Sequence, residues 1–110
     1  MNTEPALRLD GEEIEDQIID ELLDRALGRG WSVSVFDGEE FPLRRSYDKA
    51  TIRAAMRSTD TDYLYFHGPA GEAYGWIWLV YGNGEDLISD LTTGREVTAL
   101  EAQVFEANHG

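Results

Sequence analysis

The spacing of apolar and polar positions changes several times along the chain, and each change marks a predicted element. Residues 10–28 carry apolar side chains at helical spacing, with acids on the opposite side. Asp10 and Glu13 have the spacing of a capping box, and Gly28 ends the pattern. Residues 31–36 alternate with a period of two, which is typical of a half-buried strand. The chain therefore begins with an amphipathic helix and a strand.

A second strand and a short helix follow. A turn over residues 37–40 leads into a strand over 41–45. Pro42 has no N–H to give to a neighbouring strand, so this strand is expected at an edge of the sheet or at a bulge. Asp48 is a suitable N-cap for a helix over residues 49–57.

The stretch Gly75–Asp90 has the strongest strand and hairpin signal. Along residues 74–81 both alternating sets are apolar, which predicts a central strand covered on both faces. Trp76 and Trp78 are accordingly expected to serve the core. The Asn-Gly pair at 83–84 predicts a tight two-residue hairpin.

The remaining elements complete an α+β domain. Residues 63–67 alternate as a third strand, and residues 87–91 return from the hairpin as a fifth. A capping box over residues 93–96 starts a final helix. The predicted order is α-β-β-α-β-β-β-α, an antiparallel five-stranded sheet with helices packed on it. Residues 1–9 are expected to form a flexible arm, 10–107 a single domain and 108–110 a tail.

Composition narrows the classes of protein. A chain of 110 residues can bury a core as one domain. It has no cysteine, which removes disulfides, thiolate zinc sites and cysteine nucleophiles, and favours a reducing compartment. No basic start followed by an apolar run and no run of membrane-spanning length occurs, so we expect a cytoplasmic protein without membrane contact.

Charge gives the first indication of a partner. The chain has 22 acidic and 9 basic residues, for a formal net charge of −13. Such a charge opposes direct binding to nucleic acid and favours a cationic partner, such as a protein that normally binds DNA or RNA. The alternative is that the acidity only keeps a small protein soluble.

A line of acids follows one flank of the first predicted helix at steps of three or four residues: Glu13, Asp16, Asp20 and Asp24. Neighbours in such a line lie roughly 5–6 Å apart, a spacing that can imitate the phosphates of a nucleic-acid strand. The line is therefore a candidate partner-binding face. An ordinary amphipathic helix in an acidic protein presents the same pattern.

Basic residues concentrate on the second predicted helix, where Lys49, Arg53 and Arg57 recur at steps of four. This basic face can pair with the acidic helix of the same chain, pair with it across a two-fold axis in a homodimer, or remain solvated. The surrounding negative charge opposes its use for nucleic acid.

Catalytic and metal-binding patterns are weak. His67 could act as an acid or base with a nearby carboxylate, whereas His109 has no paired group in the sequence. The acidic clusters lack the ligand spacing of a calcium loop, and no serine-nucleophile or phosphate-loop motif is present. We expect no catalytic residue, metal or cofactor.

One resemblance adds context. The motifs that carry it are Ser34-Val35-Phe36-Asp37-Gly38-Glu39-Glu40, Arg45-Ser46 with Asp48, Met56 with Thr59-Asp60, Gly75-Trp76 with Leu79-Val80-Tyr81-Gly82-Asn83-Gly84, and Ile88-Ser89-Asp90. Over roughly residues 31–92 the chain resembles small uncharacterised proteins of bacteriophages and prophages. The resemblance implies no site residues. It implies an accessory factor acting on host machinery in the bacterial cytoplasm, as anti-CRISPR and anti-restriction proteins do.

Three hypotheses follow. The first is a non-catalytic acidic protein that occludes the cationic surface of a host nucleic-acid-binding protein by DNA mimicry. The second is a self-associating structural or assembly protein of phage type, joined through the basic helix and an acidic or aromatic surface. The third is a small enzyme that uses His67.

Overall fold

The computed structural model describes residues 11–109, with side chains up to residue 107. The elements, in order, are α1 (Gly11–Gly28), β1 (Ser32–Phe36), β2 (Leu43–Ser46), α2 (Lys49–Ala55), β3 (Thr61–His67), β4 (Ala73–Val80), the short 3-10 helix η2 (Gly84–Asp86), β5 (Ile88–Leu91) and α3 (Arg95–His109). The predicted α+β fold and its order of helices and strands are confirmed. The predicted N-terminal arm and the N-cap Asp10 lie outside the described residues.

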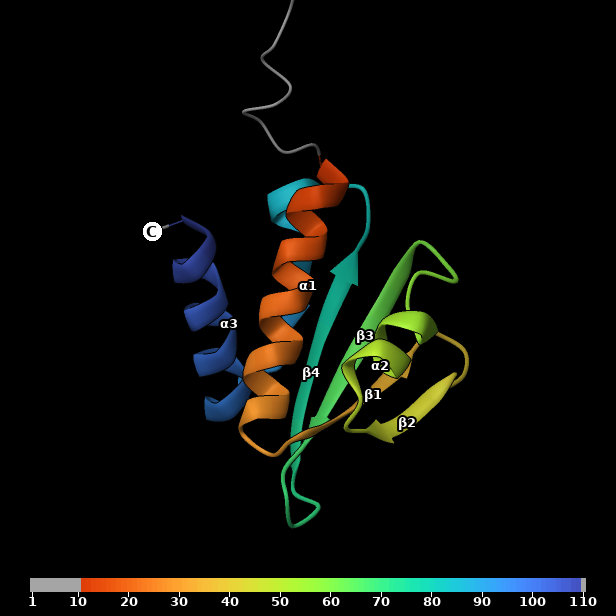
Figure 1. Cartoon of the computed structure of the whole chain (residues 1–110), viewed down its shortest axis with the longest axis vertical. Helices are drawn as coiled ribbons and strands as arrows, with labels where there is room; N and C mark the ends of the chain where they lie inside the picture. Colours follow the sequence, from red (N-terminus) through yellow and green to blue (C-terminus); the bar gives the residue numbers. More distant parts are fainter. Residues whose placement is uncertain (1–10, 110) are drawn as a thin grey trace, which may run out of the picture.

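The sheet is antiparallel with strand order β2-β1-β3-β4-β5, so β2 is an edge strand, as Pro42 predicts. Figure 1 shows α1 and α2 in front of the sheet and α3 beside α1. Here α1 contacts β1 and α3, α2 contacts β1 and β2, and α3 contacts β4. The helices therefore cover a single face of the sheet.

The core lies between this face and the helices. The strands contribute Val33, Val35, Leu64, Phe66, Ile77 and Leu79, all fully buried. The helices contribute Ile18, Ile19, Leu22, Leu23, Ala26, Ile52, Val97, Leu100 and Val104. These are the apolar positions that the helical and alternating spacings select, which is why the sequence predicts the layer correctly.

The expectation that β4 is covered on both faces is wrong. Ile77 and Leu79 are buried in the core, but Trp76 and Trp78 point to the other face and remain partly exposed outside the core cluster. None of the described helices packs there. Aromatic rings of neighbouring strands cover one another instead, as where Trp78 stacks on Tyr63 with centroids 5.7 Å apart. An apolar strand face does not require a second layer of helices when cross-strand neighbours partly shield it.

The short helix α2 ends earlier than predicted. Asp48 is its N-cap, accepting a hydrogen bond of 2.9 Å from the Thr51 N–H. The helix ends at Ala55, because Met56 is extended and Arg57 takes a left-handed φ of 68°. The Arg57 N–H leaves the helical pattern to donate to the buried Asp62 carboxylate at 2.8 Å.

The β4–β5 connection also differs from the predicted two-residue hairpin. Gly82 and Gly84 have positive φ, but Asn83 has φ −107°, and a 3-10 turn follows before β5. The N–H groups of Gly82 and Gly84 both donate to Glu15 of α1, each at 2.8 Å. A tertiary contact therefore determines the shape of this loop and overrides the local Asn-Gly preference.

Candidate functional site

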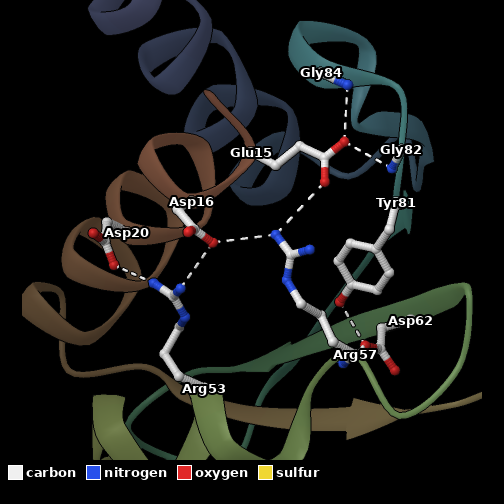
Figure 2. A network of polar contacts seen from close by, with 9 residues as sticks. All are labelled: Glu15, Asp16, Asp20, Arg53, Arg57, Asp62, Tyr81, Gly82 and Gly84. Atoms are coloured by element: carbon white, nitrogen blue, oxygen red, sulfur yellow. Dashed lines mark hydrogen bonds and ion pairs between the residues drawn. The ribbon is translucent and has the colours of Figure 1, made fainter. Parts of the chain in front are cut away.

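Three residues of the acidic line of α1 pair with basic residues of the same chain: Asp16, Asp20 and Asp24. Figure 2 shows the part of this contact made by Asp16 and Asp20 with Arg53 and Arg57. Lys49 Nζ lies 3.0 Å from Asp24 Oδ1 and 3.4 Å from Asp20 Oδ1. Arg53 reaches Asp16 at 3.0 Å and also pairs with Asp20. The sequence leaves open whether these basic residues pair within the chain, pair with a second copy or remain solvated. In the structure Lys49 and Arg53 pair with α1 of the same chain.

Arg57 extends the ion pairs into the interior. Its guanidinium lies 3.1 Å from Asp16 Oδ1 and 3.5 Å from Glu15 Oε1, and 4.6 Å from the centroid of the Tyr81 ring. Its position after the end of α2, in the left-handed region, brings the side chain to α1 and its own N–H to β3. Arg57 thus connects α1, β3 and the end of β4.

Glu15 is almost fully buried, with 2% of its surface exposed. One carboxylate oxygen accepts both N–H groups of the β4–β5 loop, and the other faces Arg57. A buried carboxylate needs such partners to offset its lost hydration. Glu15 therefore secures the β4–β5 loop to α1 and gives Arg57 its innermost contact.

Asp62 and Tyr81 form the second buried pair of the network. Asp62 Oδ2 accepts hydrogen bonds from the Tyr81 hydroxyl and the Arg57 N–H. Burial raises the pKa of Asp62, while its bonds to Tyr81 and Arg57 partly oppose that rise. Burial also raises the pKa of Tyr81, and the neighbouring Asp62 adds to this increase. The pair holds the start of β3 against the end of β4.

Glu15 and Asp62 are not among the functional residues predicted from the sequence, although the sequence holds a signal for each. Glu15 lies four residues before Ile19 and seven before Leu22, so it shares their buried stripe. Asp62 is two residues before Leu64, on the inward face of β3. A charged residue at an inward position calls for a partner, and that rule would have found both.

The sequence also singles out Glu13 and His67. Glu13 is exposed in the first turn of α1. His67 is partly buried at the end of β3, and its Nδ1 has no hydrogen-bond partner among the described residues. Burial lowers the pKa of His67, and the nearby positive charge of Arg45 lowers it further. The charge that acts on His67 is therefore basic, unlike the carboxylate that an acid-base pair requires.

A pocket of about 190 Å³ lies on another side of α1, between α3, η2 and β5. Its lining residues are Ile18, Glu85, Asp86, Ile88, Glu101, Val104 and Phe105. The pocket thus combines apolar side chains with three carboxylates. Phe105 is 54% exposed, which is high for a large apolar side chain.

No three His, Asp or Glu side chains within residues 11–107 gather closely enough to hold a metal ion. The described helices include none with the length and apolar character needed to cross a bilayer.

Comparisons of the chain with family models, with curated proteins and with solved structures found no match.

Proposed function

We propose that this protein is a non-catalytic interaction protein that covers the cationic surface of a nucleic-acid-binding protein. The supporting observation is an acid-rimmed apolar pocket on a molecule of net charge −13. A large negative charge attracts basic surfaces over distances of about 8–10 Å at physiological salt and speeds their encounter.

Internal contacts hold most of the basic side chains, which leaves the outward charge strongly negative. Lys49, Arg53 and Arg57 pair with α1, and Arg25 pairs with Glu21 at 2.9 Å. The guanidinium groups of Arg29 and Arg44 lie over the rings of Trp31 and Phe41, respectively.

The pocket between α1 and α3 suits an arginine or lysine of the partner. The long aliphatic stem of such a side chain can pack on Ile88 and Phe105, while its charged end reaches Asp86 or Glu101. Proteins that bind DNA or RNA present such side chains to phosphates. The pocket carboxylates therefore offer such a side chain a substitute for the phosphate charge of the nucleic acid.

The acidic line on α1 plays a different part in this proposal from the one expected. Asp16, Asp20 and Asp24 already bind the basic residues of α2, so using them as phosphate substitutes would require breaking these pairs. Partner contact is assigned to the pocket carboxylates instead, and the α1–α2 pairs maintain the fold.

The resemblance to phage and prophage proteins suggests the setting. In this proposal the partner is a bacterial protein that handles nucleic acid, encountered in the host cytoplasm, and the protein inhibits it as a DNA mimic of anti-restriction or anti-CRISPR type.

The test is capture from bacterial lysate followed by competition. The immobilised full-length chain should retain a DNA- or RNA-binding protein, and added double-stranded DNA should release it. The double variant Asp86→Lys/Glu101→Lys should weaken binding of that purified protein at least about tenfold, because two attractive contacts become repulsive. Binding should also weaken as salt rises.

The matched control is Glu39→Lys/Glu40→Lys, which makes the same charge change in the β1–β2 turn, away from the pocket lining. Equal losses in both double variants would mean that net charge alone drives capture. A captured protein that DNA does not displace would contradict the mimicry.

The two other hypotheses have less support. Self-association through Lys49, Arg53 and Arg57 would compete with their contacts to α1. An enzyme using His67 would need a carboxylate partner, and Arg45 is the charge that acts on His67 instead.

A further inference from the structure

The face of the sheet opposite the helices is lined by aromatic side chains. Strand register places Tyr63 opposite Trp78, Tyr65 opposite Trp76, and Phe36 opposite Tyr63, so these five residues share one face. All five are partly exposed, and none belongs to the core cluster. This set, together with Phe41, is called the aromatic face below.

The rings of the aromatic face form a continuous layer. Phe41 contacts Phe36 and Tyr65 with centroids 4.7 and 5.5 Å apart. Tyr63 contacts Trp76 and Trp78 at 5.4 and 5.7 Å. Mutual packing holds the rings in place before any partner arrives, so binding would cost little side-chain entropy.

Charge is sparse on this face. Among outward-facing strand positions that the structure describes, the charged residues lie at opposite edges of the sheet: Arg44 and Arg45, which share the bulge of β2 opposite Ser34, and Asp90 on β5. Arg44 lies over the Phe41 ring at 4.2 Å, and Asp90 pairs in register with Trp78. The face is therefore nearly neutral on a chain of net charge −13.

We propose that the aromatic face binds a second copy of this chain, forming a two-fold sandwich of facing sheets. A two-fold axis parallel to the strands places β2 of one copy over β5 of the other. Arg44 of each copy then meets Asp90 of its partner, so both edges are complementary. The helices and their acids point outward from the dimer.

The size of the face agrees with this arrangement. Five strands about 4.8 Å apart and four to eight residues long, at about 3.3 Å per residue, give a face on the order of 500 Å². Burying it in two copies removes on the order of 1,000 Å² from water, at the lower bound for a specific interface. Facing sheets pack about 10 Å apart with strands within about 30° of each other.

Single-stranded nucleic acid fits the face less well than a second copy. Proteins that stack bases on a sheet also supply a basic groove for the backbone. The basic residues on the outward strand positions described here are Arg44 and Arg45, both at the β2 edge, and the chain as a whole has a net charge of −13.

Sedimentation equilibrium of the full chain tests the proposal. The expected species has twice the monomer mass of 12.4 kDa. The dimer Kd should decrease when the NaCl concentration is raised from about 50 to about 500 mM, because salt screens the repulsion between two acidic copies. Capture of a cationic partner weakens with salt, so the two proposals succeed or fail separately.

Charge exchange tests the geometry without altering the rings. Arg44→Asp and Asp90→Arg should each raise the dimer Kd about tenfold, and the double variant should restore it to within about threefold. The matched controls are Arg95→Asp and Glu106→Arg on α3, which make the same changes of charge on the helix side of the molecule. Each should leave the dimer Kd within about threefold of the value expected from the change in net charge alone.

Trp76→Glu should abolish the dimer, with far-UV circular dichroism confirming the fold. A wild-type chain that stays monomeric at millimolar concentration overturns the proposal. So does a dimer that tolerates Trp76→Glu, or one in which the Arg44→Asp/Asp90→Arg exchange fails to restore Kd. Loss of a different protein's binding in Trp76→Glu, with a monomeric wild type, would assign the face to that protein instead.

Discussion

Replacing Glu15 is the most direct test of how α1 is held to the sheet. Its carboxylate is 2% exposed and accepts two backbone N–H groups at 2.8 Å from the β4–β5 loop. Hydrogen bonds to a charged group are worth about 1.5–3 kcal/mol each, and removing one partner of a buried charged cluster costs about 3–5 kcal/mol. Glu15→Ala should therefore lower the free energy of unfolding by about 3–5 kcal/mol.

Glu15→Gln separates the shape of the side chain from its charge. The amide oxygen can still accept the loop N–H groups, but the attraction to Arg57 at 3.5 Å is lost. A smaller loss of about 1–2 kcal/mol is expected, since neutral hydrogen bonds are weaker than charged ones. Urea denaturation followed by circular dichroism measures both values, and Glu15→Ala should lower the Tm by more than about 12 °C.

Asp24→Ala is the control, because Asp24 is 60% exposed and pairs with Lys49 at the surface. An exposed pair of this kind is worth less than about 1 kcal/mol. If Glu15→Ala and Asp24→Ala destabilise equally, water must be able to replace the carboxylate at the loop. In that case Glu15 does not secure the loop.

Three further changes probe other contacts. Burial raises the pKa of Asp62, so the protonated carboxyl contributes stability below its usual pKa of 3.8, and this stability is lost as pH rises through the pKa in the folded state. In urea titrations the wild type should therefore lose stability relative to Asp62→Asn as pH increases from about 4. A gain of stability over the same range would contradict this. Gly75 has φ 133°, and a Cβ at this position would lie 2.0 Å from Thr92 Oγ1. Gly75→Ala should therefore lower the free energy of unfolding by about 2–4 kcal/mol, measured by heat or urea. Gly75→Ala/Thr92→Ala should recover only part of this loss, and full recovery would exclude backbone strain as a cause. Asp48→Ala removes the N-cap of α2 and should cost about 1 kcal/mol in the same assay, whereas no change would mean that the cap is dispensable.

The fold could be predicted from the sequence because each element has a clear period of its own. The stripe of α1 and the alternation of β1 and β3 identify the inward side chains without knowledge of their neighbours. The edge position of β2 also follows from a local cause, the missing N–H of Pro42.

What could not be predicted depends on contacts between distant segments. Alternation shows that Trp76 and Trp78 share a face, but the path of the helices decides whether that face is covered. The Asn-Gly turn yields to Glu15, which is 67 residues away from Gly82.

The candidate site was only partly predictable for the same reason. Spacing identifies the acidic and basic helix faces, yet pairing within the chain and pairing between chains give the same sequence pattern. The position of α2 against α1 distinguishes them, and that position depends on the left-handed turn at Arg57. The pocket combines four separate elements, so no single segment of sequence indicates it.

The contact between Glu15 and the β4–β5 loop has a consequence for synthesis on the ribosome. The two N–H groups that it binds belong to residues made 67 and 69 positions later. At about 5–20 residues per second, roughly 3–14 s pass between the synthesis of Glu15 and that of its partners. Throughout that interval the apolar side of α1 also lacks Leu79, Val97 and Leu100, which share its buried cluster in the folded protein. The nascent chain is thus most exposed to chaperones and proteases before its last third emerges, and α1 is the segment that they would meet.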